Sequence, residues 1–133
     1  MRNQSGVAVA LLLLGFATGA VGQDVAIADP QHYRVIFENS HIRVIRGRDV
    51  PGDKTPVHHH PAYLSIPDGP VKTKITLENG QTLIDGPSDA VWCSPPTTHA
   101  TENVGTANTN EIIVEFKDFN PCDDRSAGQQ ASR

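Results

Sequence analysis

Apolar and polar residues alternate with a period of two in several short runs along the chain. HYRVIFEN (32–39) and HIRVIRGRDV (41–50) both alternate in this way, which predicts strands with one buried face. In VKTKITLENGQTLIDG (71–86), Asn79-Gly80 separates two such runs and predicts a β-hairpin. EIIVEFKDF (111–119) predicts a further strand.

Helices are not expected beyond the N-terminal segment. No run after residue 23 keeps a 3.6-residue apolar period, and prolines fall between the alternating runs, where they would interrupt a long helix. The pattern predicts an all-β sandwich or barrel of about eight short strands, whose closure would remove exposed sheet edges. A chain of 133 residues has the size of one compact domain.

The first residues have the pattern of a cleavable export signal. Arg2 precedes an apolar run from Val7 to Ala17, and the small residues Ala20 and Gly22 precede Gln23, so we expect cleavage after Gly22. The apolar run is shorter than the ~20 residues that cross a bilayer. We therefore expect a periplasmic or secreted protein with no stable membrane insertion after cleavage.

This pattern divides the chain into four parts. They are a signal peptide (1–22), an N-terminal linker (23–31), a β-domain (32–118) and a flexible, polar C-terminal tail (119–133).

The charge of the chain excludes some classes of partner. The formal net charge is −4, and loss of Arg2 with the signal would make it more negative by one unit. Nucleic acids and anionic membranes require clustered positive charge, so neither is an expected partner. Cys93 and Cys122 are the two cysteines, and export permits a disulfide between them, although two free thiols are an equal alternative.

Three consecutive histidines stand in PVHHHPAYLSI (56–66). On a strand, His58 and His60 share one face and His59 points to the other. Two imidazoles on one face can bind one ion if a neighbouring strand supplies a third ligand, and His99 in SPPTTHATEN is the best placed. Such a site suits divalent Fe, Mn, Ni, Cu or Zn. The alternative is a solvated histidine cluster in a polar loop.

These motifs resemble those of the cupin superfamily. Gly52, followed by five residues and then His58 and His60, is similar to the first cupin motif, and PPTTHATEN (95–103) is similar to the second. The resemblance covers nearly all of residues 32–117 and is to small single-domain, type-2 cupins of the quercetin-dioxygenase-like kind. It implies a cupin-type jelly-roll β-barrel and a metal site of His58, His60 and His99. Many cupins dimerise, so it also allows a homodimer.

The chain departs from the first motif at one position that matters for chemistry. The family has a glutamate three or four residues after the second histidine, where this chain has Leu64 and Ser65. The missing carboxylate argues against a quercetinase-type mechanism, whereas three-histidine cupins include thiol dioxygenases. Trp92 is expected in the core, with the mouth of the barrel as the alternative. Parity along the strand places Tyr63 outside the cavity. The same argument predicts that the cavity lining includes Leu64, Ile66, Val91 and Phe116.

Two functions fit these observations. The first is an exported metal-dependent dioxygenase acting on a small organic molecule, with no catalytic residue identified beyond the metal ligands. The second is an exported cupin that binds a metal or small ligand without turning it over, as a sensor or carrier. A jelly roll with vestigial ligands is a third, purely structural alternative.

Overall fold

The computed structural model describes residues 22–123, which form two five-stranded sheets. The first sheet has the order β1-β4-β9-β6-β7 and the second has the order β2-β3-β10-β5-β8. The elements are β1 (Gln23–Asp24), α1 (Val25–Ala28), β2 (Tyr33–Glu38), β3 (Ile42–Asp49), β4 (His58–His60), β5 (Tyr63–Pro67), β6 (Val71–Leu77), β7 (Thr82–Ser88), β8 (Trp92–Ser94), β9 (Thr97–Asn103) and β10 (Thr109–Phe116).

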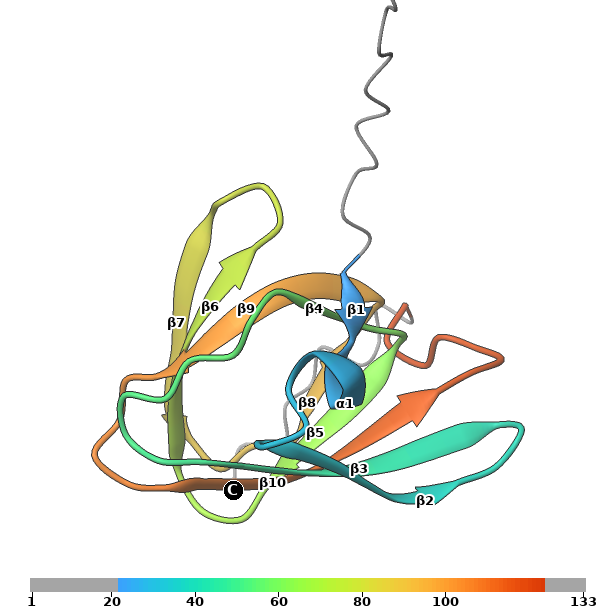
Figure 1. The fold of residues 1–133 in the computed structure, drawn as a ribbon, viewed down its shortest axis with the longest axis horizontal. Helices are drawn as coiled ribbons and strands as arrows, with labels where there is room; N and C mark the ends of the chain where they lie inside the picture. Colours follow the sequence, from blue (N-terminus) through green and yellow to red (C-terminus); the bar gives the residue numbers. More distant parts are fainter. Residues whose placement is uncertain (1–21, 124–133) are drawn as a thin grey trace, which may run out of the picture.

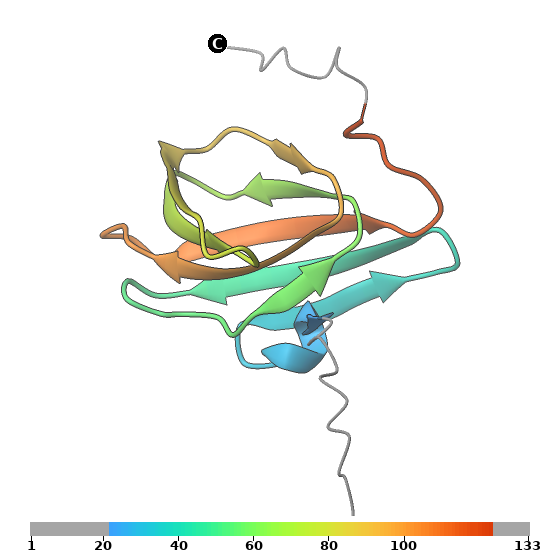
Figure 2. The same ribbon diagram turned by 90° about the horizontal axis from the view of Figure 1, so that it is seen from above.

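The two sheets face each other, as Figures 1 and 2 show. The predicted all-β class is confirmed. Neighbouring strands in each sheet are antiparallel except for the short parallel pair of β1 and β4. The predicted signal peptide, apart from Gly22, and residues 124–133 of the predicted tail lie outside the described residues.

The predicted hairpin at Asn79-Gly80 is present, and the two predicted strands before it also pair with each other. β2 and β3 pair directly, and β6 pairs with β7 across the turn at Asn79-Gly80. Gly80 has a φ of 82°, a conformation that glycine adopts without a steric cost. The Asn79 side chain accepts a hydrogen bond from the backbone of Gln81 at 2.9 Å, which stabilises the turn.

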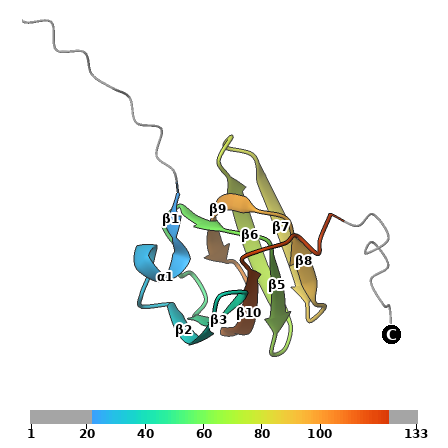
Figure 3. The ribbon, with the colours of Figure 1, turned by 90° about the vertical axis from the view of Figure 1, so that its right-hand side faces the viewer.

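The linker predicted over residues 23–31 is wrong, because this segment belongs to the folded domain. Residues 23–24 add β1 to the edge of β4, and the short helix α1 follows. Val25 is fully buried in the hydrophobic core. Figure 3 shows β1 and α1 together on one side of the domain, with β7 and β8 on the other. A four-residue helix is too short to show a periodicity in the sequence.

The hydrophobic core is small. Its buried members are Val25, Tyr33, Ile45, Tyr63 and Ile113. A group of polar side chains is buried between the sheets as well, namely His58, His60, His99, Asn103 and Glu115. Burial of a polar group is costly unless it finds a partner, so the interior is organised around this polar group. Among residues 22–123, no helix is long and apolar enough to cross a membrane.

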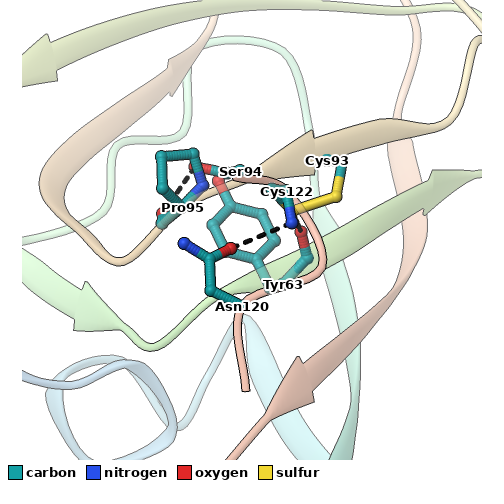
Figure 4. Close-up of a disulfide and its surroundings, with 6 residues drawn as sticks. All are labelled: Tyr63, Cys93, Ser94, Pro95, Asn120 and Cys122. Carbon is teal, nitrogen blue, oxygen red and sulfur yellow. Dashed lines mark hydrogen bonds between the residues drawn. A yellow bond between two sulfur atoms is a disulfide. The ribbon is translucent and has the colours of Figure 1, made fainter. Parts of the chain in front are cut away.

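A disulfide joins Cys93 in β8 to Cys122, with Cα atoms 5.5 Å apart. Figure 4 shows Tyr63 beside the bridge, and the Cys122 sulfur lies 3.7 Å from the carbonyl oxygen of Tyr63. The Asn120 side chain accepts a hydrogen bond from the Cys122 backbone at 2.9 Å. The described start of the predicted flexible tail is therefore tied to the second sheet.

Replacing both cysteines by serine should lower the free energy of unfolding by roughly 3.6 kcal/mol, because closing a loop of this size removes about that much conformational entropy, as TΔS, from the unfolded chain. The bridge closes a loop with a sequence separation of 29 residues. Urea denaturation with and without a thiol reductant measures the effect. The reductant should shift the wild-type midpoint and leave the double variant unchanged; equal wild-type midpoints would contradict the prediction.

Candidate functional site

Neighbouring strands bring His58, His60 and His99 together inside the domain. His58 and His99 are cross-strand partners in the β4–β9 ladder, and His60 lies two residues along β4 on the same face. The ring centroids are 4.8 Å (His58–His99), 5.0 Å (His58–His60) and 5.5 Å (His60–His99) apart. All three side chains are buried. The expectation that these three rings meet is confirmed, and we call them the histidine triad.

Hydrogen bonds hold two of the rings in one orientation. The Nδ1 of His58 donates to the carbonyl oxygen of Pro56 at 2.8 Å, and the Nδ1 of His60 donates to Glu115 at 2.6 Å. Each ring then directs its Nε2 away from these partners. The Nε2 of His58 is buried and has no hydrogen-bond partner among the described residues.

An unpartnered buried nitrogen needs an explanation, since leaving it so costs roughly 1–3 kcal/mol. The triad offers one ligand nitrogen from each ring, and these three nitrogens lie within 4.8 Å of one another. Imidazole is a common ligand for first-row transition metals. The residues therefore fit a metal ion, and no fourth protein ligand joins them among residues 22–123.

The electrostatics of the site favour uncharged rings. Burial, followed by the charge of His60, lowers the pKa of His58 to about 4. Burial, followed by the charges of His58 and His60, lowers the pKa of His99 to about 3. Both rings are neutral near pH 7, and metal binding requires this form because protons compete for the same nitrogen.

A buried ionic network lies behind His60. The carboxylate of Glu115, which accepts the His60 hydrogen bond, also accepts one from Nε of Arg43 at 2.6 Å. Arg43 makes a further ion pair with Asp24, the residue that caps α1. Glu115 is 1% exposed, so its charge is compensated by these partners rather than by water.

The other histidines take part in different contacts. His59 lies on the opposite face of β4, and its Nδ1 contacts the Thr98 hydroxyl at 3.1 Å. His32 bridges Asp29 and Asp53, while His41 pairs with an aspartate near the end of the domain. None of them joins the triad, as the sequence predicts.

A cavity of about 80 Å³ adjoins the triad and is lined in part by His60 and His99. Tyr63 lines this cavity too, with its ring centroid 4.7 Å from that of His60, so its predicted outward position is wrong. Trp92 lines the cavity and is 46% exposed, so it takes the alternative position at the mouth rather than a place in the core.

The four lining residues predicted by parity are absent from the cavity wall, which contains Ser65 and Ile113 instead. For Leu64 and Ile66 the reason is local. Pro61-Ala62 breaks the chain between β4 and β5, so the alternation of β4 does not continue into β5.

Three polar residues near the triad could not be found from motifs. Glu111 and Glu115 on β10 and Asp49 on β3 face the interior. The available signal was the spacing of the two glutamates by four residues, which places them on one face of a strand. The alternate face carries Ile112, Val114 and Phe116, so alternation alone would place the two glutamates toward solvent. Asn103 holds the turn that follows β9 through its side-chain bonds to Gly105 and Ala107.

Comparison with solved structures shows the cupin fold. A cupin domain from Bordetella pertussis Tohama I aligns with a TM-score of 0.56 and 20% identity, covering 64% of this chain and 91% of that one. An RmlC-like cupin with a double-stranded β-helix fold from Methanocaldococcus jannaschii aligns with a TM-score of 0.52 and 14% identity, over 63% of this chain and 77% of that one.

A cupin superfamily protein from Desulfitobacterium hafniense DCB-2 has a TM-score of 0.51 and 12% identity, and the alignment covers 65% of this chain and 76% of that one. No family model and no curated protein matches the sequence. The chain therefore has the fold of a small single-domain cupin, with three buried histidines that could hold a metal.

In metal-free protein, the free energy of unfolding should fall as the pH falls from 6.5 toward 4. In this window the unfolded histidines bind protons while His58 and His99 of the folded protein do not, so the unfolded state gains stability. The depressed pKa of His58 alone corresponds to roughly 3 kcal/mol. Urea denaturation at several pH values measures the slope.

The matched variants for this measurement are His58→Gln and His41→Gln. The first removes a buried titrating ring and should flatten the slope, whereas the second removes an exposed ring and should leave it unchanged. An identical slope in wild type and His58→Gln would refute the prediction.

Proposed function

We propose that the protein is an exported cupin that binds one divalent transition metal ion through His58, His60 and His99. The observation that carries this proposal is the buried Nε2 of His58, which has no partner in the described structure and lies beside the donor atoms of the other two rings. Three imidazole ligands suit Zn, Fe, Mn, Ni or Cu. They leave coordination positions for a small molecule.

The surrounding residues prepare the rings for this role. Pro56 and Glu115 accept hydrogen bonds from the Nδ1 atoms of His58 and His60. In both rings this leaves Nε2 as the nitrogen that can bind a metal ion. Such outer hydrogen bonds fix the orientation of a ligating imidazole and raise its basicity. When bound, the ion would supply a Lewis acid and, if redox-active, a centre for oxygen chemistry.

We further propose that the site is a metal-dependent dioxygenase for a small organic molecule. The cavity beside the triad supports a small-molecule ligand, because its wall combines apolar side chains with hydroxyl and carboxylate groups and such walls are typical of ligand sites. The alternative is a non-catalytic metal or ligand carrier. The replacement of the family's glutamate by Leu64 or Ser65 favours this alternative, because it removes a base beside the triad. Oxygen uptake by iron-loaded protein with thiols and catechols separates the two.

Export to the periplasm or the cell exterior is the proposed location. The N-terminal signal pattern and the Cys93–Cys122 disulfide support it independently, since disulfides persist in oxidising compartments.

Protein purified from the periplasm without a tag should contain about one equivalent of transition metal, and the pair His58→Ala and His60→Ala should remove it, because one remaining imidazole holds a divalent ion weakly. Elemental analysis by mass spectrometry gives the measurement. His59→Ala is the matched control, since this ring lies on the other face of β4. Metal-free wild type that also fails to take up zinc would overturn the proposal.

Glu115→Gln should weaken zinc binding by ~10–100-fold, the usual effect of removing the acceptor behind a ligating histidine. Competition with a chromophoric chelator measures the affinity, and circular dichroism checks that the variant folds. Glu38→Gln alters a glutamate that pairs with Lys117 at the surface and should bind zinc like wild type. An unchanged affinity in Glu115→Gln would show that Glu115 does not position His60.

A further inference from the structure

The cavity beside the triad extends to a second polar end. Glu111, Ile113 and Glu115 lie on one face of β10 because strand side chains alternate. Glu115 supports His60 at the histidine end, and Glu111 is ~13 Å further along the strand. Both His60 and Glu111 line the same cavity, so a ligand bound beside Glu111 occupies the space that adjoins the triad.

The carboxylate of Glu111 is held in place by its neighbours. Ser65 on the adjacent strand β5 donates a hydrogen bond from its hydroxyl to Glu111 at 2.5 Å. The cross-strand partner of Glu111 on β3 is Gly47. A Cβ atom at Gly47 would lie 2.9 Å from Cγ of Glu111 and 3.0 Å from its Oε1. The absence of a side chain at Gly47 therefore makes room for the glutamate in the cavity wall.

The same wall carries further negative charge. Asp49 and Asp85 also line the cavity, and the Asn103 amide fixes Asp49 by donating a hydrogen bond at 2.7 Å. No lysine or arginine is among the lining residues in the described part of the chain. Burial raises the pKa of Glu111, so a cation brought beside it favours the charged carboxylate, whereas an anion does not.

The remaining wall combines hydroxyl groups with apolar side chains, and the space is small. Val71, Ile75 and Ile113 line the cavity and offer contacts to a short hydrocarbon segment. Its volume of about 80 Å³ is roughly half that of an engineered cavity that binds benzene. A three-ring flavonol does not fit inside, whereas a chain of a few non-hydrogen atoms does.

We propose that the cavity binds short aliphatic amines and amino alcohols, that Glu111 binds their amino group, and that the acidic wall excludes small carboxylates. The hydroxyl group of a bound amino alcohol would point toward the triad, and this part of the proposal rests on the proposed metal function. The recognition of the amine by Glu111 rests on the cavity alone.

Titration of the full exported protein with ethanolamine and with glycolate, followed by NMR of backbone amides, tests this inference. The two probes are similar in length and differ in charge. Wild type should bind ethanolamine at least ~10-fold more tightly than glycolate in metal-free protein, because a ligand charge near fixed carboxylates contributes an energy of this order. The amide shifts should fall on residues that line the cavity.

Glu111→Gln should reduce the ethanolamine affinity by about 10-fold or more, and Glu102→Gln is the matched control because Glu102 pairs with surface lysines outside the cavity. Gly47→Ala crowds Glu111 without changing any charge, so it should also weaken the binding of ethanolamine. This variant replaces Glu111→Gln in the test if Glu111→Gln does not fold. Equal binding of the two probes by wild type, or an unaltered affinity in both variants, would overturn the inference.

The zinc content of each sample separates this inference from the proposed function. Suppose that the wild type takes up zinc but, when it is metal-free, binds glycolate more tightly than ethanolamine. This result would overturn the amine site and leave the metal site standing. Wild type that takes up no zinc but binds ethanolamine through Glu111 would overturn the metal site and leave the amine site standing.

Discussion

The structure depends on burying three imidazole rings in contact with one another between two small sheets. The cross-strand pairing of His58 with His99 fixes two rings in register, and the burial that depresses their pKa values keeps them uncharged. Three positive rings at this spacing would repel one another strongly in a medium with little water. The three rings therefore occupy interior volume that apolar side chains would fill in a comparable domain. The hydrophobic core is correspondingly small.

The N-terminal segment is connected to this site through charges. Asp24 pairs with Arg43, and Arg43 pairs with Glu115. Glu115 in turn accepts a hydrogen bond from Nδ1 of His60. Because each partner is largely buried, the loss of one would leave the next uncompensated. The predicted signal cleavage after Gly22 would leave Gln23–Asp24, and hence β1, intact. Cleavage at that point is thus compatible with a site that needs Asp24, whereas cleavage a few residues later would remove it.

Sequence patterns predicted the strands and the triad but not the orientation of the strands around the site. The Asn79-Gly80 hairpin follows from local turn chemistry, and His58, His60 and His99 follow from strand spacing together with the cupin-like motifs. On β10 the apolar alternation points the wrong way, because Ile113 and Glu115 are buried while Ile112 and Val114 lie on the opposite, half-buried face. Periodicity assumes that the inward face is apolar. That assumption fails where the interior is a polar site, and no local signal marks the change.

The position of the acid distinguishes this cavity from the cupin pattern that the sequence resembles. Where the motif has a glutamate on the strand after the histidine pair, this chain has Leu64, which turns away from the cavity, and Ser65, which lines it. A carboxylate is nevertheless present, since Ser65 donates to Glu111 from the neighbouring strand. A hydroxyl at this position cannot ligate a metal as a carboxylate would. It can, however, donate a hydrogen bond that holds the Glu111 carboxylate at the far end of the cavity. The chain thereby has its acidic side chain on the cavity wall opposite this position, and the triad has no carboxylate among its possible ligands in the described residues.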